Sequence, residues 1–415
     1  MSGCIKITDL LIIISNAFTY VKRAYKIRDM KVTIVCDVLG EPNNGTSIAA
    51  YNLINFMKSK GHQVKVLCPD ELKKGEPGYY ILPHLNFGVF NNYVAKNGVS
   101  LAKYDAATVE EACKDADIIH IMMPFSAGKM AAEYAHTHHI PLSAGFHVQA
   151  ENITSHLYAM NSKNINAFTY KRLWKSVYQY ADNIHYPTQF ICDYVKKYGI
   201  KAPHEHVISN GVNKMFHKKE TLKPQAYRDR FVILTSGRYS KEKNQQMIIE
   251  AIGRSKYNEK IQLILAGSGP QKENLFKLAE KRLVNRPLFI LASRERLVDL
   301  INYSDLYVHA SKIEIEAISC LEALCCGVVP VISDSPRSAT SRFALVNKSR
   351  FKNNSVKDLT EKIEYWIEHP KEKEEASKLY TEFAKQFDFD YCMQRMEDML
   401  IEVVKDYKKE HGQEK

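Results

Sequence analysis

The chain has 415 residues, of which 45% are hydrophobic and 25% charged, and these ordinary values exclude a largely disordered protein. This length exceeds that of one typical domain, so we expect two domains. Lysine and arginine outnumber aspartate and glutamate by 58 to 47, and the net charge of +11 favours binding of a polyanion, whether nucleic acid, an anionic membrane or a phosphorylated substrate.

The cysteines and the first apolar run indicate the compartment. Nine cysteines are scattered without a CxxC pair or a metal-ligand spacing, which favours a reducing compartment over a disulfide framework. The apolar run Leu10–Ile14 is too short to span a bilayer, and basic residues follow it rather than precede it. We therefore predict no export signal and a cytoplasmic protein.

Residues 1–29 read as an N-terminal extension, and a regular α/β pattern begins at Met30. Short apolar runs then alternate with longer amphipathic stretches, which predicts a parallel sheet with right-handed crossovers. The predicted strands of this first half are Val32–Cys36, Gln63–Cys68, Ile118–Ile121, Pro141–Phe146 and Asn183–Tyr186, with a helix at Ser47–Lys60 between the first two.

A second series of the same kind follows Asn210-Gly211. Its predicted strands are Phe231–Thr235, Gln262–Ala266, Leu288–Leu291, Leu306–His309 and Val329–Ser333, with helices at Gln245–Ile252 and Lys272–Leu283. We predict an α/β protein of two Rossmann-like, doubly wound domains, residues 30–205 and 206–387, facing each other across a cleft. A last helix at about 388–415 packs back on the first domain. Ligands of such sheets bind at the carboxyl ends of the strands, so the cleft is the expected site.

A basic turn follows the strand Phe231–Thr235. Gly237 lets the backbone turn sharply, and Arg238 and Lys243 can converge on a diphosphate, the first as a planar fork and the second as a point charge. The alternative is a solvated basic turn without a ligand.

Two glutamates flank the start of a predicted helix near Ala317 and Ile318. Free N–H groups at such a helix start would face a bound phosphate. Glu322 lies in an apolar run, where an unpaired carboxylate is costly, and could accept hydrogen bonds from ribose hydroxyls. Glu314 lies in the preceding loop, near the sugar. The alternative is a buried helix with capping or surface glutamates.

In order and separation, these segments resemble the donor-site signatures of retaining glycosyltransferases of the family 4 type, which have the GT-B fold. Asn210-Gly211-Val212 with Phe216 is similar to the family's domain-entry motif, and Ala266–Pro270 to its glycine-proline turn. The resemblance covers nearly everything from Met30 to the end. It departs at Ile315-Glu316-Ala317, where Gly-Phe-Gly is commoner.

The resemblance implies a role for each matching residue of the second half. Arg238 and Lys243 would hold the donor diphosphate, Glu322 the ribose, and Glu314 the transferred sugar as a catalytic residue. The donor site would further include Gly267 of the glycine-proline turn, the helix start Ala317-Ile318, and Arg294 in the loop that meets the base.

In the first half the resemblance implies that Gly45 lies beside the donor phosphates and that His147 is catalytic, near sugar and acceptor. The segment that continues from His147 to Glu151 and Asn152 resembles the same segment of bacterial glycosyltransferases that glucosylate diacylglycerol. Glu151 and Asn152 would therefore lie near the acceptor. A common strand-helix turn and a structural histidine are the alternatives for Gly45 and His147.

Residues 152–181 contain no acidic residue and predict a basic amphipathic helix. Its apolar face includes Trp174, and Lys171, Arg172 and Lys175 lie mostly elsewhere, which suits an anionic membrane surface. The alternative is a helix that packs on its own sheet.

The expected function is therefore transfer of a hexose, glucose from UDP-glucose, to the hydroxyl of a diacylglycerol or membrane glycolipid, with retention and without a metal or other cofactor. The expected partners are a nucleotide-sugar donor, a lipid acceptor and the inner face of the cell membrane, without nucleic acid. Alternatives are transfer to cell-wall or exopolysaccharide acceptors, a nucleotide-sugar epimerase of the same architecture, and a non-catalytic binding protein suggested by charge alone.

Overall fold

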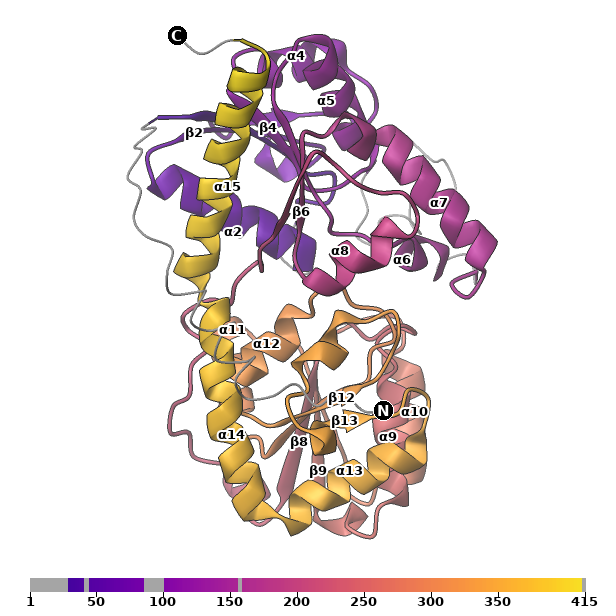
Figure 1. Cartoon of the computed structure of the whole chain (residues 1–415). Coiled ribbons are helices and arrows are strands. Elements are labelled where there is room, and N and C mark those ends of the chain that lie inside the picture. Colours follow the sequence, from indigo (N-terminus) through magenta and orange to yellow (C-terminus); the bar gives the residue numbers. More distant parts are fainter. Residues whose placement is uncertain (1–28, 41–44, 86–100, 156–158, 413–415) are drawn as a thin grey trace, which may run out of the picture.

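The computed structural model describes residues 29–40, 45–85, 101–155 and 159–412. The predicted extension, except Asp29, therefore lies outside the described residues. Two α/β domains lie one above the other, the first coloured indigo to magenta and the second orange in Figure 1. All strand pairs of both sheets are parallel. The predicted fold class of two doubly wound domains is confirmed.

The described part of the first domain contains a seven-stranded sheet in the order β3-β2-β1-β4-β5-β6-β7. Its strands are β1 (Lys31–Val35), β2 (Gln63–Cys68), β3 (Tyr79–Ile81), β4 (Ile118–Ile121), β5 (Leu142–Gly145), β6 (Asn183–Tyr186) and β7 (His204–Val207). Its helices are α2 (Gly45–Ser59), α4 (Ala106–Cys113), α5 (Ser126–Thr137), α6 (Ala150–Ser155), α7 (Lys163–Ser176) and α8 (Gln189–Lys196). Side chains of the central strands are almost wholly buried because helices cover both faces.

The second domain has a six-stranded sheet in the order β10-β9-β8-β11-β12-β13 within the described residues. Its strands are β8 (Phe231–Ser236), β9 (Ile261–Ala266), β10 (Leu288–Ile290), β11 (Leu306–His309), β12 (Pro330–Ser333) and β13 (Arg350–Phe351). The helices are α9 (Gln245–Arg254), α10 (Lys272–Arg282), α11 (Arg294–Asn302), α12 (Ile318–Cys325), α13 (Val356–Glu368) and α14 (Pro370–Ala384). The order reverses between β8 and β11, which places a ligand-binding crevice at their carboxyl ends.

The last helix, α15 (Phe389–Glu410), returns to the first domain and buries one face in its core. His62 joins the two, since its Nδ1 accepts from the Met30 N–H at 3.2 Å and its Nε2 lies 2.9 Å from the Glu397 carboxylate. This pairing fixes the histidine tautomer, with the proton on Nε2.

The chain crosses between the domains twice, and the two crossings lie against each other. The Val212 N–H donates to the Phe387 carbonyl at 2.8 Å. Gly211 has a left-handed φ of +73°, and a Cβ there would lie 3.1 Å from the Phe389 Cα. This glycine is therefore needed both for the turn and for the close approach of the two backbones.

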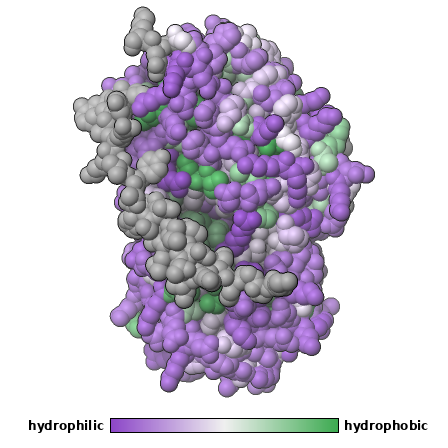
Figure 2. Space-filling view, viewed as in Figure 1, coloured by the Kyte–Doolittle hydropathy of each residue, from purple (hydrophilic) through white to green (hydrophobic). Residues whose placement is uncertain are grey.

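The face shown in Figure 2 is mostly hydrophilic, with hydrophobic residues between the two domains and at the right edge of the upper domain, over α7. None of the helices in the described part combines the length and apolar character that a membrane span requires. All eight cysteines that the structure describes are free thiols.

Candidate active site

The loops after β8 and β9 are joined backbone to backbone at the floor of the cleft. The Gly237 N–H donates to the Ala266 carbonyl at 2.9 Å, and the Tyr239 N–H to the Ser268 carbonyl at 2.8 Å. A Cβ on Gly267 would lie 2.0 Å from the Gly237 carbonyl oxygen. Gly267 is thus required by packing between the two loops, which shape the predicted phosphate site.

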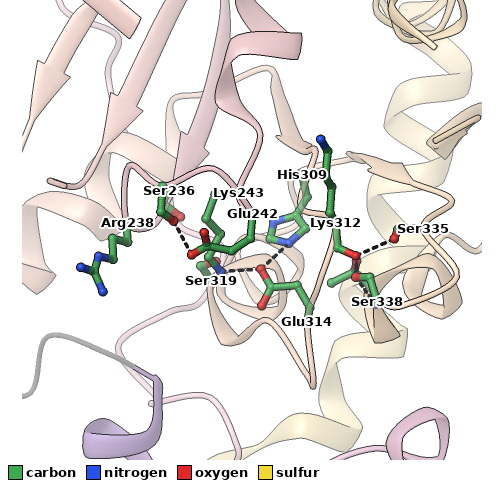
Figure 3. A network of polar contacts seen from close by, with 12 residues as sticks. Ser236, Arg238, Glu242, Lys243, His309, Lys312, Glu314, Ser319, Ser335 and Ser338 are labelled. Atoms are coloured by element: carbon green, nitrogen blue, oxygen red, sulfur yellow. Dashed lines mark hydrogen bonds and ion pairs between the residues drawn. The ribbon is translucent and has the colours of Figure 1, made fainter. Parts of the chain in front are cut away.

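Lys243, Glu314 and His309 form a buried cluster at the carboxyl ends of β8 and β11, shown in Figure 3. The Lys243 Nζ forms a short ion pair with the Glu314 Oε1, and the His309 Nε2 lies 3.1 Å from the same oxygen. Burial would raise the pKa of Glu314, but the charge of Lys243 and the hydrogen bond to His309 outweigh it and lower the pKa to about 2. Glu314 is therefore an anion across the whole physiological range.

The loop that carries Glu314 is also held through its backbone. The Glu314 N–H donates to the Arg337 carbonyl at 3.3 Å, and the Ala339 N–H donates to the Glu314 carbonyl at 2.9 Å. The Lys312 N–H donates to the Glu242 carbonyl at 2.8 Å, which ties this loop to the one after β8. These bonds fix the carboxylate before any ligand binds.

Ala317 caps α12 in a left-handed conformation, with φ +62° and ψ +66°. This conformation costs a residue with a Cβ roughly 1–2 kcal/mol, which explains why glycine suits this position. The first turn of α12 follows directly, at Ile318, as predicted. Its free N–H groups lie one residue after the strained turn, a setting typical of phosphate binding.

Glu322 lies in α12 and is buried, with Arg294 of α11 as its partner at 3.5 Å. Burial raises the pKa of Glu322 to about 7, and the Arg294 charge opposes this rise. The Arg294 guanidinium also lies over the Phe216 ring, 5.2 Å from its centroid. The structure therefore brings together two residues predicted for the nucleoside end of the donor.

Arg238 does not converge with Lys243 in this arrangement. Figure 3 shows its guanidinium pointing away from the Lys243–Glu314 pair, although both residues belong to one loop. The Arg238 carbonyl accepts from the Gln245 Nε2 at 2.8 Å, which fixes the backbone while the side chain extends outward. Its contact with a donor diphosphate stays a prediction.

The sequence did not single out Glu316, which joins the loop between β11 and α12 to Ser209 and Asn210, where the chain first crosses between the domains. Its carboxylate accepts a short hydrogen bond from the Ser209 hydroxyl, a bond from the Asn210 Nδ2 at 2.5 Å and bonds from the Asn210 N–H. Ile315 packs against the core of the first domain, and its carbonyl accepts from the Thr188 hydroxyl at 2.7 Å. The segment Ile315-Glu316-Ala317, where the family more often has Gly-Phe-Gly, thus forms a contact between the two domains.

His147 follows β5 and lies at the cleft side of the first domain. The residue as a whole is partly exposed, whereas its Nε2 is enclosed without a hydrogen-bond partner among the described residues. Gly145 makes room for the ring, because a Cβ there would lie 2.7 Å from the His147 Nε2. Burial, followed by the neighbouring His185 and His120, lowers the pKa of His147 well below its usual value, so the imidazole is neutral at pH 7.

Gly45 begins α2 in the first domain and is exposed. A Cβ there would meet no described atom within 4 Å, so packing in the described part does not demand a glycine. Open space over this backbone leaves the predicted donor contact available.

Two predicted acceptor residues need correction. Glu151 is only 1% exposed, and its oxygens accept from the Tyr170 and Tyr194 hydroxyls at 2.6 and 2.5 Å. It therefore joins α6, α7 and α8 and does not face an acceptor. Trp174 is partly buried against the domain core rather than presented to a membrane. Asn152 is half-buried, and its Oδ1 accepts from the Gln149 N–H at 3.1 Å, so it caps the start of α6.

His309 and Arg337 were also missed. His309 ends a predicted strand, and a polar residue at that position was the available signal. Arg337 donates to the Met160 carbonyl at 3.0 Å and to the Asn161 Oδ1 at 2.9 Å across the cleft. No group of three His, Cys, Asp or Glu side chains in the described ranges is arranged to hold a metal ion.

Comparison with known proteins identifies the family. A family model described as Glycosyltransferase Family 4 matches residues 43–215, and one described as Glycosyl transferases group 1 matches residues 217–383. The chain is a glycosyltransferase of the family 4 type. The two models meet at the first domain crossing, so each domain of this glycosyltransferase corresponds to one model.

Three relatives illustrate this similarity. The glycosyltransferase is 25% identical over 310 residues to an alpha-monoglucosyldiacylglycerol synthase of Acholeplasma laidlawii, covering 70% of this chain and 76% of that protein. It is 23% identical over 319 residues to a GDP-mannose-dependent alpha-mannosyltransferase of Corynebacterium glutamicum, covering 73% and 72%. The Anabaena protein HepE, solved with UDP and glucose, shares its GT-B fold at a TM-score of 0.71 and 17% identity, covering 90% of this chain and 100% of that one.

Proposed function

We propose that this glycosyltransferase moves glucose from UDP-glucose to a hydroxyl group of a membrane lipid, with retention at the anomeric carbon and without a metal. The observation that carries the proposal is the Lys243–Glu314–His309 cluster beside the start of α12. A cation, a fixed anion and free N–H groups at one crevice suit a diphosphate and the sugar attached to it. The glucosyl and lipid parts of the proposal are supported by the name of the Acholeplasma relative.

The mechanism follows from these charges. The acceptor hydroxyl attacks the anomeric carbon on the face that the diphosphate leaves, and a diphosphate oxygen takes its proton. Lys243 and the N–H groups of α12 stabilise the negative charge that grows on the diphosphate. Glu314 stays ionised because of its low pKa and stabilises the positive charge that develops on the sugar ring. His147, neutral at pH 7, can hydrogen-bond a sugar hydroxyl without adding a charge.

Contact with an anionic membrane is part of the proposal, and it rests on the outer face of α7. Phe168 is 60% and Ile165 43% exposed on this face. Exposed Lys171, Arg172 and Lys175 surround them, and α7 contains no acidic residue. Basic groups with apolar side chains between them bind lipid surfaces through charge and insertion together.

A donor and acceptor screen tests the proposed reaction. Purified protein is incubated with UDP-glucose or GDP-mannose and a lipid extract, products are identified by mass spectrometry, and the new anomeric centre is assigned by NMR. We expect an α-glucosyl lipid from UDP-glucose, formed equally well in EDTA. An inverted product, a requirement for a divalent metal, or conversion of the donor to another nucleotide sugar without an acceptor would contradict the proposal.

Vesicle sedimentation tests the membrane contact. Wild-type protein should bind vesicles that contain phosphatidylglycerol and not vesicles of phosphatidylcholine alone. Phe168→Ser with Lys171→Gln should weaken this binding at least about tenfold, since one insertion and one basic contact are lost. A control variant, Lys357→Gln at an exposed position of α13, should bind normally. Equal binding by both variants would refute the role of α7.

A further inference from the structure

A pocket of about 580 Å³ lies at the mouth of the cleft, outside the cluster of Lys243 and Glu314. We call it the mouth pocket. The first domain contributes the end of α6 and the residues before α7, and the second contributes the loop after β8 with the starts of α9 and α10. Its volume falls in the range of about 300–1,000 Å³ typical of small-molecule sites.

Four carboxamides line the mouth pocket: Asn161, Gln246, Gln271 and Asn274. The Asn274 Nδ2 donates to the Gln271 Oε1 at 3.1 Å, so each amide orients the other. This bond leaves the Gln271 NH₂ and the Asn274 carbonyl for a ligand. The Gln246 side chain has no hydrogen-bond partner among the residues described. Gln246 thus offers both donor and acceptor atoms, Gln271 a donor and Asn274 an acceptor, as a ligand rich in hydroxyl groups requires.

The rest of the lining narrows the ligand class. Leu275, Leu278 and Met160 supply an apolar patch, which suits the C–H face of a sugar ring. A bare acyl chain is a poor occupant, because it would strip water from four amides without replacing their hydrogen bonds.

The mouth pocket shares its wall with the reactive centre. Lys312 lies two residues before Glu314, and Figure 3 shows its side chain extending away from the Glu314 carboxylate. Across the cleft, Arg337 holds the Met160 carbonyl and Asn161, so both domains must be in this arrangement for the pocket to exist. If Glu314 contacts the transferred sugar as proposed, a molecule in the pocket would lie beside that sugar rather than in its place.

We propose that the mouth pocket binds a sugar residue of the acceptor, so that the enzyme extends an acceptor that already carries a sugar. This inference rests on the proposed glycosyl transfer and adds the class of acceptor. The sugar can belong to a glycolipid headgroup or to a soluble oligosaccharide, because both present the same hydroxyl groups to the four amides.

The test compares acceptors with and without a sugar. Transfer from UDP-glucose is measured to monoglucosyldiacylglycerol, to diacylglycerol in the same micelles, and to a soluble glucose disaccharide. We expect kcat/KM at least about tenfold higher for a sugar-bearing acceptor than for diacylglycerol. The preference for glycolipid over disaccharide, or the reverse, identifies the source of the sugar and supports the inference either way.

Variants connect this preference to the pocket. Gln246→Leu and Asn274→Leu should each lower kcat/KM for the sugar-bearing acceptor about five- to tenfold through KM, with unchanged diacylglycerol transfer and unchanged UDP binding in calorimetry. Lys277→Leu, an exposed position of α10 outside the lining, is the matched control.

The outcomes separate this inference from the proposed function. Equal use of diacylglycerol and sugar-bearing acceptors, or leucine variants that behave like the control, would overturn the acceptor class alone. Failure of the wild-type protein to bind UDP-glucose or UDP would overturn the proposed function and this inference with it.

Discussion

Removing the Lys243 ammonium should destabilise the second domain, because Glu314 would remain buried without its cation. The pKa of Glu314 falls from 4.5 to about 2 in the folded protein. At about 1.4 kcal/mol for each pH unit, this shift corresponds to about 3 kcal/mol of stability. Because the folded pKa is the lower one, this stability is fully present above pH 4.5 and is lost as the pH falls through about 2.

We therefore expect Lys243→Ala to lose about 3 kcal/mol of unfolding free energy at pH 7, and roughly 6–12 °C in Tm. In a Glu314→Gln background, Lys243→Ala should lower the free energy of unfolding by less than about 1 kcal/mol, because no buried carboxylate is left without a cation. The sequence alone suggests that Lys243→Ala abolishes transfer and leaves the fold intact. The structure predicts loss of transfer together with this loss of stability.

The chain has two tryptophans, Trp174 and Trp366, so a Trp174→Phe background lets Trp366 of α13 report on the second domain alone. Urea unfolding followed by this fluorescence gives the four free energies of the cycle. Calorimetry with UDP adds a second readout, because Glu314→Gln frees the ammonium and should preserve or strengthen UDP binding. Equal destabilisation by Lys243→Ala in both backgrounds would refute the buried ion pair.

Three further predictions concern the donor site. Gly267→Ala should lower the free energy of unfolding by roughly 2 kcal/mol or more, because the new Cβ would lie 2.0 Å from the Gly237 carbonyl oxygen. Gly45→Ala should leave Tm nearly unchanged, because a Cβ there meets no described atom within 4 Å. It should weaken UDP binding at least about tenfold, as measured by calorimetry. Unchanged UDP binding by Gly45→Ala would contradict its place in the donor site. Ala317→Gly should raise stability by about 0.5–1 kcal/mol in thermal unfolding, by relieving its left-handed backbone, and an unchanged or lower Tm would argue against that strain. The folded pKa of Glu322, about 7, lies above its usual 4.5, so its contribution to stability is present below pH 4.5 and lost as the pH rises through about 7. Glu322→Gln should flatten this decline between pH 5 and pH 8.5, and parallel Tm profiles would count against the raised pKa.

The central strands of both sheets could be predicted from sequence because burial on both faces gives them continuous apolar runs. Three edge strands could not. β7 (His204–Val207) is rich in polar residues and half-buried, β3 has three residues, and β13 has two, so none carries a recognisable hydrophobic pattern.

The donor-site residues were recognisable by their order along the chain, whereas their pairings were not. Nothing in the spacing indicated that Lys243 pairs with Glu314 before any ligand binds, or that Glu316 joins the donor loop to Ser209 and Asn210. Glu151 shows the opposite error, since a polar residue after a strand looked functional but is held by two tyrosines from later helices. Such contacts join residues far apart in sequence, and periodicity carries no information about them.

The two crossings between the domains lie side by side, joined by the bond between Val212 and Phe387. This pairing puts both covalent links between the domains at one place, which would act as a hinge. The Glu316 bonds to Ser209 and Asn210 lie beside these crossings. The Arg337 bonds to Met160 and Asn161 join the domains beside the start of α7, which follows Asn161 in the chain. A separation of the domains about the crossings would have to break these bonds and would open the cleft on the side of α7.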